Sequence, residues 1–130
     1  MITLSNVHKA FGDNKVLRGI DLTVPKGTST VVIGGSGTGK SVLLKMMNGL
    51  VLPDQGEVRL FGQALHELSE LEQVALRKRC TMVFQNYALI DSMSVRDNIA
   101  FPLEQNSSLG RAEIDALIEE LLELLELPNT

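Results

Sequence analysis

Apolar and polar residues alternate in two segments near the N-terminus of the chain. Residues 2–7 (ITLSNV) alternate over their length, and residues 16–24 (VLRGIDLTV) alternate in their later half. A period of two places the apolar side chains on one face of a β-strand. The turn residues 12–14 (GDN) lie between the segments, and residues 25–27 (PKG) form a second turn. The pattern therefore predicts two half-buried strands joined by a turn.

Three later segments also have the pattern of strands. Residues 30–33 (TVVI) and 81–84 (TMVF) are short apolar runs bounded by other residue types, which indicates buried strands. Residues 57–61 (EVRLF) alternate, after a turn at residues 52–56 (LPDQG), and Gly62 ends this strand. We expect the two apolar runs to belong to the core of the domain.

Helical spacing and capping residues predict short helices between these strands. Residues 42–47 (VLLKMM) are apolar at helical spacing, and residues 48–49 (NG) form a C-terminal cap. Residues 69–72 (SELE) form a capping box, which predicts a helix from there to Arg79.

The last third of the chain is predicted to be helical. Ser94 and Asp97 indicate the start of a short helix over residues 95–100, which we expect Pro102 to end. Gly110 begins the clearest helix, and Pro128 is expected to stop it. The apolar positions of this helix recur at steps of three and four residues: Ile114, Leu117, Ile118, Leu121, Leu122 and Leu125. Glutamates cover most of the remainder and predict a solvated acidic face.

Composition limits the class of protein. A length of 130 residues allows one domain at most, and 44% hydrophobic with 22% charged residues is ordinary for a globular protein. A net charge of −4 argues against nucleic-acid binding. With one cysteine, Cys80, no intrachain disulfide can form, and no apolar run has the length of a membrane span. No signal-peptide pattern is present, so we expect a cytosolic location.

The chemistry of the chain centres on residues 34–41 (GGSGTGKS), which fit the phosphate-binding pattern G-x-x-x-x-G-K-[ST]. The pattern lies between a predicted strand and a predicted helix, as its mechanism requires. Glycines let backbone N–H groups turn toward an anion at a helix N-terminus. Lys40 can reach the β- and γ-phosphates, and the Ser41 hydroxyl can bind Mg²⁺. The sequence therefore predicts that the chain binds a nucleoside triphosphate.

Three further positions are candidates for contact with the nucleotide. Phe11 stands just before the first turn, where an aromatic ring can either stack on a purine or pack under the hairpin. Position alone does not decide between these alternatives. The role of Val16, as a nucleotide contact or a core residue, is undecided in the same way. Gln85 follows the strand at residues 81–84, and ligands of open α/β sheets bind beyond the carboxyl ends of strands. Gln85 is therefore placed to meet phosphate, Mg²⁺ or water.

Taken together, these residues resemble the N-terminal half of an ABC-transporter ATPase subunit. The resemblance rests on the β segments before residues 34–41, on Phe84 and Gln85 at a strand end, and on the acidic helix. It implies an incomplete α/β P-loop NTPase domain with an antiparallel β subdomain, a partial core sheet and helices. Residues 1–85 would form the β subdomain and P-loop core. Residues 86–130 would form the Q-loop and the start of the helical subdomain.

The resemblance also implies the site and its ligands, ATP and Mg²⁺. Lys40 and Gln85 would be the catalytic residues, and Ser41 and Gln85 would bind the metal. Most members carry a second hydroxyl residue where this chain has Val42, and a valine side chain cannot form the hydrogen bond to phosphate that a hydroxyl group could form there. The nucleotide-binding residues would be Phe11, which stacks on adenine, and Val16, Gly34, Gly35, Ser36, Gly37, Thr38, Gly39, Lys40, Ser41 and Val42.

A narrower resemblance concerns the transported substrate. Residues 35–45 and 88–103 are similar to ATPases of Mla-type phospholipid transporters, although Asn86 and Tyr87 differ from the small residues common there. The resemblance implies permease subunits and a second ATPase subunit as partners, at the inner face of the membrane. The alternatives are an amino-acid or metal importer and a nucleotide-binding module without turnover. A GTPase or small-molecule kinase is disfavoured, because no Asn-Lys-x-Asp run is present.

The sequence lacks several elements that the family carries further along. It contains no L-S-G-G signature, no apolar strand ending in Asp-Glu and no switch histidine after them. Because the Glu after the Asp normally activates water, we expect this chain to bind ATP but to hydrolyse it poorly. We also expect exposed apolar faces and open sheet edges, and therefore a marginal or self-associating fold.

Overall fold

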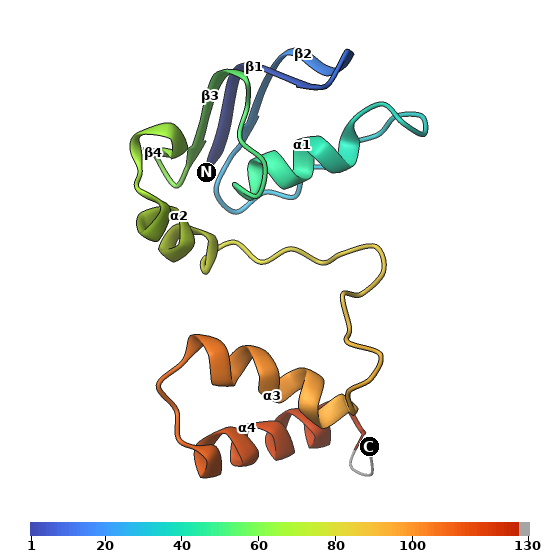
Figure 1. Cartoon of the computed structure of the whole chain (residues 1–130), viewed down its shortest axis with the longest axis vertical. Helices are drawn as coiled ribbons and strands as arrows, with labels where there is room; N and C mark the ends of the chain where they lie inside the picture. The colour runs from blue at the N-terminus through green and yellow to red at the C-terminus, as the bar shows by residue number, and fades with distance from the viewer. Residues whose placement is uncertain (128–130) are drawn as a thin grey trace. The chain divides into compact units, whose positions relative to one another are not determined.

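The computed structural model describes residues 1–127. The chain divides into two compact units, Met1–Met82 and Val83–Thr130, which are described separately below (Figure 1). Within the described residues, no helix is long and apolar enough to cross a membrane.

The first unit is built on an antiparallel sheet of four strands in the order β2-β1-β3-β4 (Figure 1). The strands are β1 (Ile2–Phe11), β2 (Asn14–Val24), β3 (Gln55–Leu60) and β4 (Gln63–Ala64). Ile2 pairs with Val24 and Phe11 with Asn14, so the predicted hairpin and its turn are confirmed. The predicted strand at residues 57–61 is also confirmed, because it forms most of β3.

Helix α1 (Lys40–Met47) packs its apolar face against this sheet (Figure 1). Full burial of one large aliphatic side chain stabilises a fold by about 1.5–3 kcal/mol, so the sheet and α1 hold one another in place. The buried side chains of this core are Leu4, Val7, Leu17, Leu43, Met46, Met47, Val58, Leu60, Leu65 and Leu76.

The end of α1 confirms the cap predicted at residues 48–49. Gly49 has φ +77°, a left-handed conformation that costs glycine little. The Gly49 N–H donates to the Met46 carbonyl at 3.0 Å, and the Leu50 N–H donates to the Lys45 carbonyl at 2.8 Å. These two bonds form a Schellman motif, which satisfies carbonyls that the helix end would leave unpaired.

After β4 the chain forms the short 3₁₀ helix η1 (Leu65–Glu67) and helix α2 (Glu70–Arg77). The predicted capping box is confirmed: the Ser69 hydroxyl accepts from the Glu72 N–H, and the Glu72 carboxylate accepts from the Ser69 N–H. Arg77 donates a hydrogen bond to the Gly49 carbonyl at 3.2 Å, which ties the end of α2 to the end of α1.

The second unit is a helical hairpin of α3 (Val95–Asn106) and α4 (Arg111–Leu124) (Figure 1). Its small core contains Ala100 of α3 and Ile114, Ile118 and Leu122 of α4. Arg96 on α3 forms ion pairs with Asp115 and Glu119 on α4. The helix predicted to begin after Gly110 is confirmed, since Gly110 is its N-cap. Most glutamates of α4 lie on the solvent side, as the pattern predicted.

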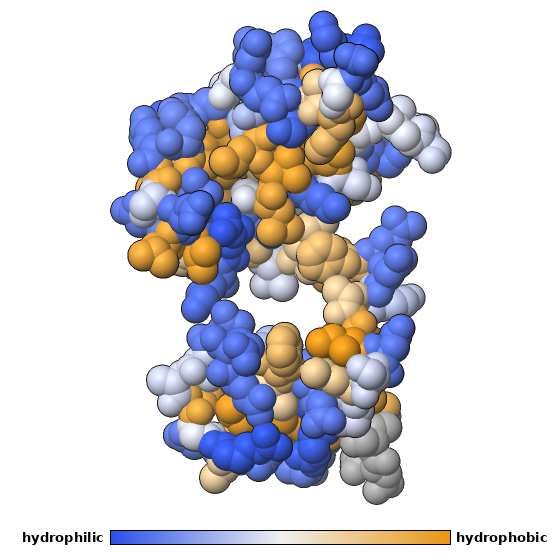
Figure 2. Space-filling view, in the orientation of Figure 1, coloured by the Kyte–Doolittle hydropathy of each residue, from blue (hydrophilic) through white to orange (hydrophobic). Residues whose placement is uncertain are grey.

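The strands predicted at residues 30–33 and 81–84 do not form within the described structure. Val31 and Ile33 are 78% and 90% exposed, and Val83 is 88% exposed. A strand exists only as part of a ladder of hydrogen bonds, and no described segment pairs with these two runs. The expected partial core sheet is therefore absent from residues 1–127. The expected exposure of apolar surface is observed (Figure 2).

Pro102 does not end its helix, so that prediction is wrong. Helix α3 continues through Pro102 to Asn106. The proline lacks an N–H, but two side chains of the following turn support the helix end. Asn106 Nδ2 donates to the Pro102 carbonyl at 3.0 Å, and the Ser107 hydroxyl donates to the Leu103 carbonyl at 2.6 Å. The predicted stop at Pro128 lies outside the described residues.

Candidate nucleotide site

The glycine-rich segment leads directly into the N-terminus of α1. Gly39 is the N-cap with φ +92°, and Lys40 and Ser41 are the first two residues of the helix. A Cβ atom on Gly39 would lie 2.8 Å from Val16 Cγ1 and 3.1 Å from Leu17 Cδ2. Position 39 therefore requires glycine for two reasons, its left-handed backbone and its contact with β2. Val16, a candidate from the sequence, lies against this loop.

The backbone of the loop supplies a set of unpaired donors. Within residues 1–127, the N–H groups of residues 36–42 donate to no protein acceptor. Residues 40–42 form the first turn of α1, where the helix dipole adds partial positive charge. Successive N–H groups at a helix N-terminus bind anionic oxygens. The chemistry of this donor set fits the phosphates of a nucleotide.

Lys40 folds its side chain back over the loop. Its Nζ donates to the carbonyl of Gly34 at 2.8 Å and to that of Gly35 at 2.5 Å. Thr38 Oγ1 donates to the same Gly35 carbonyl at 2.9 Å. Phosphate oxygens form stronger hydrogen bonds with an ammonium group than neutral carbonyls do. A bound phosphate can therefore draw Lys40 away from the loop carbonyls.

Ser41 and Val42 have different surroundings. Ser41 is exposed, and within the described residues its hydroxyl has no protein partner, which suits a metal ligand. Val42 is partly buried and packs against the core of the first unit. The structure thus gives Val42 a packing role.

Phe11 lies at the end of β1, beside the hairpin turn. Its side chain is 52% exposed, so it is not a core residue. The Nζ atom of Lys9 lies 5.6 Å from the centroid of the Phe11 ring, within the range of a cation–π interaction. An exposed aromatic ring held at a strand end is suited to stack on a base.

Gln85 belongs to the second unit, Val83–Thr130, whereas the glycine-rich segment belongs to the first. It is exposed and opens the turn at residues 85–88. Tyr87 and Ala88 in this turn have φ +60° and +55°, which is unusual for residues with side chains. The backbone just after Gln85 is therefore held in a strained conformation.

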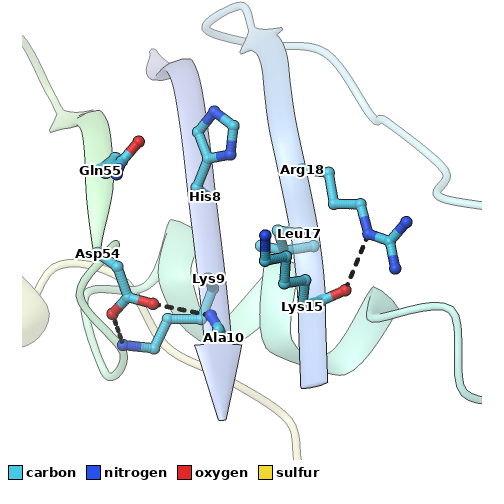
Figure 3. Close-up of a pocket in the computed structure, with 8 residues that line it drawn as sticks. All are labelled: His8, Lys9, Ala10, Lys15, Leu17, Arg18, Asp54 and Gln55. Carbon is cyan, nitrogen blue, oxygen red and sulfur yellow. Dashed lines mark hydrogen bonds and ion pairs between the residues drawn. The ribbon is translucent and has the colours of Figure 1, made fainter. Parts of the chain in front are cut away.

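A hollow of about 420 Å³ contains two residues that sequence reasoning missed, Lys9 and Asp54 (Figure 3). Asp54 accepts a hydrogen bond from Lys9 Nζ at 2.7 Å and another from the Ala10 N–H at 2.7 Å. The bond from Lys9 and then that from Ala10 hold the pKa of Asp54 below its ordinary value of 3.8. In the sequence Asp54 is one residue of a turn, and nothing local indicates its partner on β1.

This fold and this loop define a P-loop nucleotide-binding protein. Residues 17–130 match the family described as ABC transporter. The chain belongs to that family, which confirms the resemblance at family level.

Curated relatives align with nearly the whole chain. It is 39% identical over 129 residues to the methionine import ATP-binding protein MetN of Clostridium tetani, covering 99% of this chain and 40% of that protein. It is 39% identical over 122 residues to protein TRIGALACTOSYLDIACYLGLYCEROL 3, chloroplastic, of Arabidopsis thaliana, covering 94% and 35%. The sulfate/thiosulfate import ATP-binding protein CysA of Thermosynechococcus vestitus is 40% identical over 126 residues, covering 97% and 36%. The chain thus spans 35–40% of the length of these relatives.

A solved structure supports the same assignment. The ATP-binding cassette MJ0796, in a dimeric post-hydrolysis state bound to ADP and Pi, is similar with a TM-score of 0.79 and 28% identity. The alignment covers 97% of this chain and 57% of the cassette chain. The fold class predicted from the sequence, an incomplete ABC-type P-loop domain, is confirmed.

Proposed function

We propose that this chain is the nucleotide-binding part of an ABC-transporter ATPase, which couples the binding and hydrolysis of ATP to transport across a membrane. One observation carries the proposal: the unpaired N–H groups of residues 36–42 and the Lys40 ammonium gather at one helix N-terminus. Such a donor set recognises the phosphates of a nucleotide rather than its base. Family membership supports ATP as the nucleotide.

In this proposal the residues have separate roles. Lys40 and the loop N–H groups bind the β- and γ-phosphates, and Phe11 and Val16 contact the adenine. Ser41 and Gln85 would hold Mg²⁺, which neutralises charge on the phosphates. Gln85 also orients the attacking water.

We further propose that these residues bind ATP but hydrolyse it poorly on their own. Catalysis of phosphoryl transfer depends on a residue that positions water as well as on electrostatic stabilisation. These residues span 40% of the length of the MetN relative. We propose that the glutamate that activates water as a general base lies outside the segment that these residues cover. The proposed partners are a second ATPase subunit and transmembrane permease subunits, with the protein at the cytoplasmic face of the membrane. The dimeric cassette supports pairing of ATPase subunits.

We propose phospholipid as the transported substrate, on the similarity of residues 35–45 and 88–103 to Mla-type ATPases. The Arabidopsis relative, whose name is that of a glycolipid, supports a lipid. A second candidate is an amino acid, because several relatives are methionine import proteins. The two substrates differ enough in size and polarity to be separated by one assay.

The test is reconstitution of the complete subunit with its permease in vesicles. Transfer of labelled phospholipid that requires ATP and stops in a Lys40→Ala variant supports the proposal. ATP-dependent uptake of methionine without lipid transfer would replace it with amino-acid import. A Lys45→Ala variant is a matched control, since Lys45 is an exposed lysine of the same helix.

A further inference from the structure

Asp54 ties the loop before β3 to the last residues of β1 (Figure 3). Its carboxylate accepts from Lys9 Nζ and from the Ala10 N–H, each at 2.7 Å. Its own N–H donates to the His8 carbonyl at 2.9 Å. Asp54 thus holds His8, Lys9 and Ala10, which directly precede Phe11 in the sequence.

Lys9 connects this arrangement to the Phe11 ring. Its ammonium lies 2.7 Å from Asp54 Oδ1 and 5.6 Å from the ring centroid. The Lys9 side chain is only 17% exposed, so its position is restricted by its neighbours. Asp54 therefore fixes the cation that contacts the ring, and through Ala10 it also fixes the backbone that carries the ring.

The ionic state of the aspartate supports this arrangement at neutral pH. The hydrogen bonds from Lys9 and Ala10 hold the pKa of Asp54 below its ordinary value, so the carboxylate stays charged. Hydrogen bonds to an ionised acceptor are stronger than those between neutral groups.

We propose that Lys9 and Asp54 are positioning residues for the nucleotide base, which hold the Phe11 ring ready to stack on the purine. The inference rests on the proposed function, in which Phe11 stacks on adenine. A free aromatic side chain loses rotamer freedom when a ligand binds, and fixing the ring beforehand removes that cost. Loss of this preorganisation should weaken ATP binding about threefold to tenfold.

The test compares two ligands that share phosphates but not a base. ATP and inorganic tripolyphosphate, each with Mg²⁺, are titrated into the wild-type chain and an Asp54→Ala variant. We expect ATP to bind about threefold to tenfold more weakly to the variant, and tripolyphosphate to bind both within about twofold. Asp13→Ala is the matched control, because Asp13 is an exposed carboxylate at the adjoining turn without a partner in the described residues. An equal loss of affinity for ATP and for tripolyphosphate would overturn the inference.

A double-mutant cycle with Phe11→Leu separates the inference from the proposed function. If Asp54 acts through Phe11, adding Asp54→Ala to the Phe11→Leu chain should cause no further loss of ATP affinity. Additive losses would overturn the inference. If Phe11→Leu leaves ATP affinity unchanged, stacking in the proposed function fails, and the inference fails with it.

A measurement without ligand tests the same arrangement. In wild type the Phe11 ring should shift the NMR signals of the Lys9 ε-methylene protons, and in Asp54→Ala these signals should return to the values of a free lysine. Unchanged signals would overturn the inference even if the chain binds no nucleotide.

Discussion

The side-chain amide of Asn48 donates a hydrogen bond to the carbonyl of Cys80 at 2.5 Å, across 32 positions of sequence. Asn48 is the C-cap of α1 and the one buried polar residue among residues 1–127. The bond fixes the end of the helix that begins with Lys40 to the chain segment that follows α2. It is thus a structural link between parts of the first unit that the sequence does not place together.

The first prediction concerns this link. Asn48→Ala removes the bond and leaves the Cys80 carbonyl without its partner, which should lower the free energy of unfolding by about 1–3 kcal/mol. Chemical denaturation measures the change. Asn86→Ala serves as the control, because the exposed Asn86 side chain forms no bond within the described residues. Equal stability of the Asn48→Ala variant and wild type would show that the link is unimportant.

The second prediction concerns the two left-handed glycines of the phosphate loop. Gly37→Ala should lower the free energy of unfolding by roughly 1–2 kcal/mol, because alanine is strained in the left-handed backbone conformation of this position. No steric overlap adds to this, since nothing lies within 4 Å of the added Cβ. Gly39→Ala adds the overlap with Val16 and should cost about 1–3 kcal/mol more. Denaturant unfolding of both variants checks the order. A Gly37→Ala variant that is as unstable as Gly39→Ala would contradict the role of Val16.

The third prediction concerns pH and the capping box of α2. Hydrogen bonds from the Ser69 hydroxyl and N–H hold the pKa of Glu72 below its ordinary value of 4.5. Because the pKa is lower in the folded chain, the stabilisation is complete above that ordinary value and is lost as pH falls through the folded value. Glu72→Gln should therefore be less stable than wild type at neutral pH, and the difference should shrink in acid. A difference independent of pH would contradict the account.

The fourth prediction concerns Pro102 inside α3. Pro102→Ala restores the N–H that the helix lacks, and an interior proline costs about 3 kcal/mol relative to alanine. The more flexible unfolded state of the variant offsets about 0.4–1 kcal/mol of this gain. We expect a net stabilisation of the helical hairpin, measured by circular dichroism during denaturation. Pro53→Ala, outside any helix, should bring no such gain. Loss of helicity in Pro102→Ala would contradict this reasoning.

Features that depend on neighbouring residues were predictable from the sequence. The capping box at Ser69, the cap at Gly49 and the hairpin turn each need only a few adjacent residues, and each is present in the structure. The phosphate loop was recognisable for the same reason, because its donors come from consecutive residues.

Features that depend on distant residues were not predictable. The runs at residues 30–33 and 81–84 have the composition of strands, but a strand also requires partners, and none pairs with them in the described structure. The Lys9–Asp54 ion pair joins residues 45 positions apart, and no local pattern indicates it. Pro102 failed as a helix stop because packing of Ala100 and the bonds made by Asn106 outweigh the missing N–H.

The most direct measurement is a calorimetric titration of the 130-residue chain with Mg-ATP, beside Lys40→Ala and the exposed control Lys45→Ala. Charge-assisted bonds to phosphate are worth about 1.5–3 kcal/mol, so Lys40→Ala should bind ATP about tenfold to a hundredfold more weakly. Wild type and Lys45→Ala should bind saturably with equal affinity. Equal affinities of wild type and Lys40→Ala, or no saturable binding by wild type, would contradict a phosphate site at this loop.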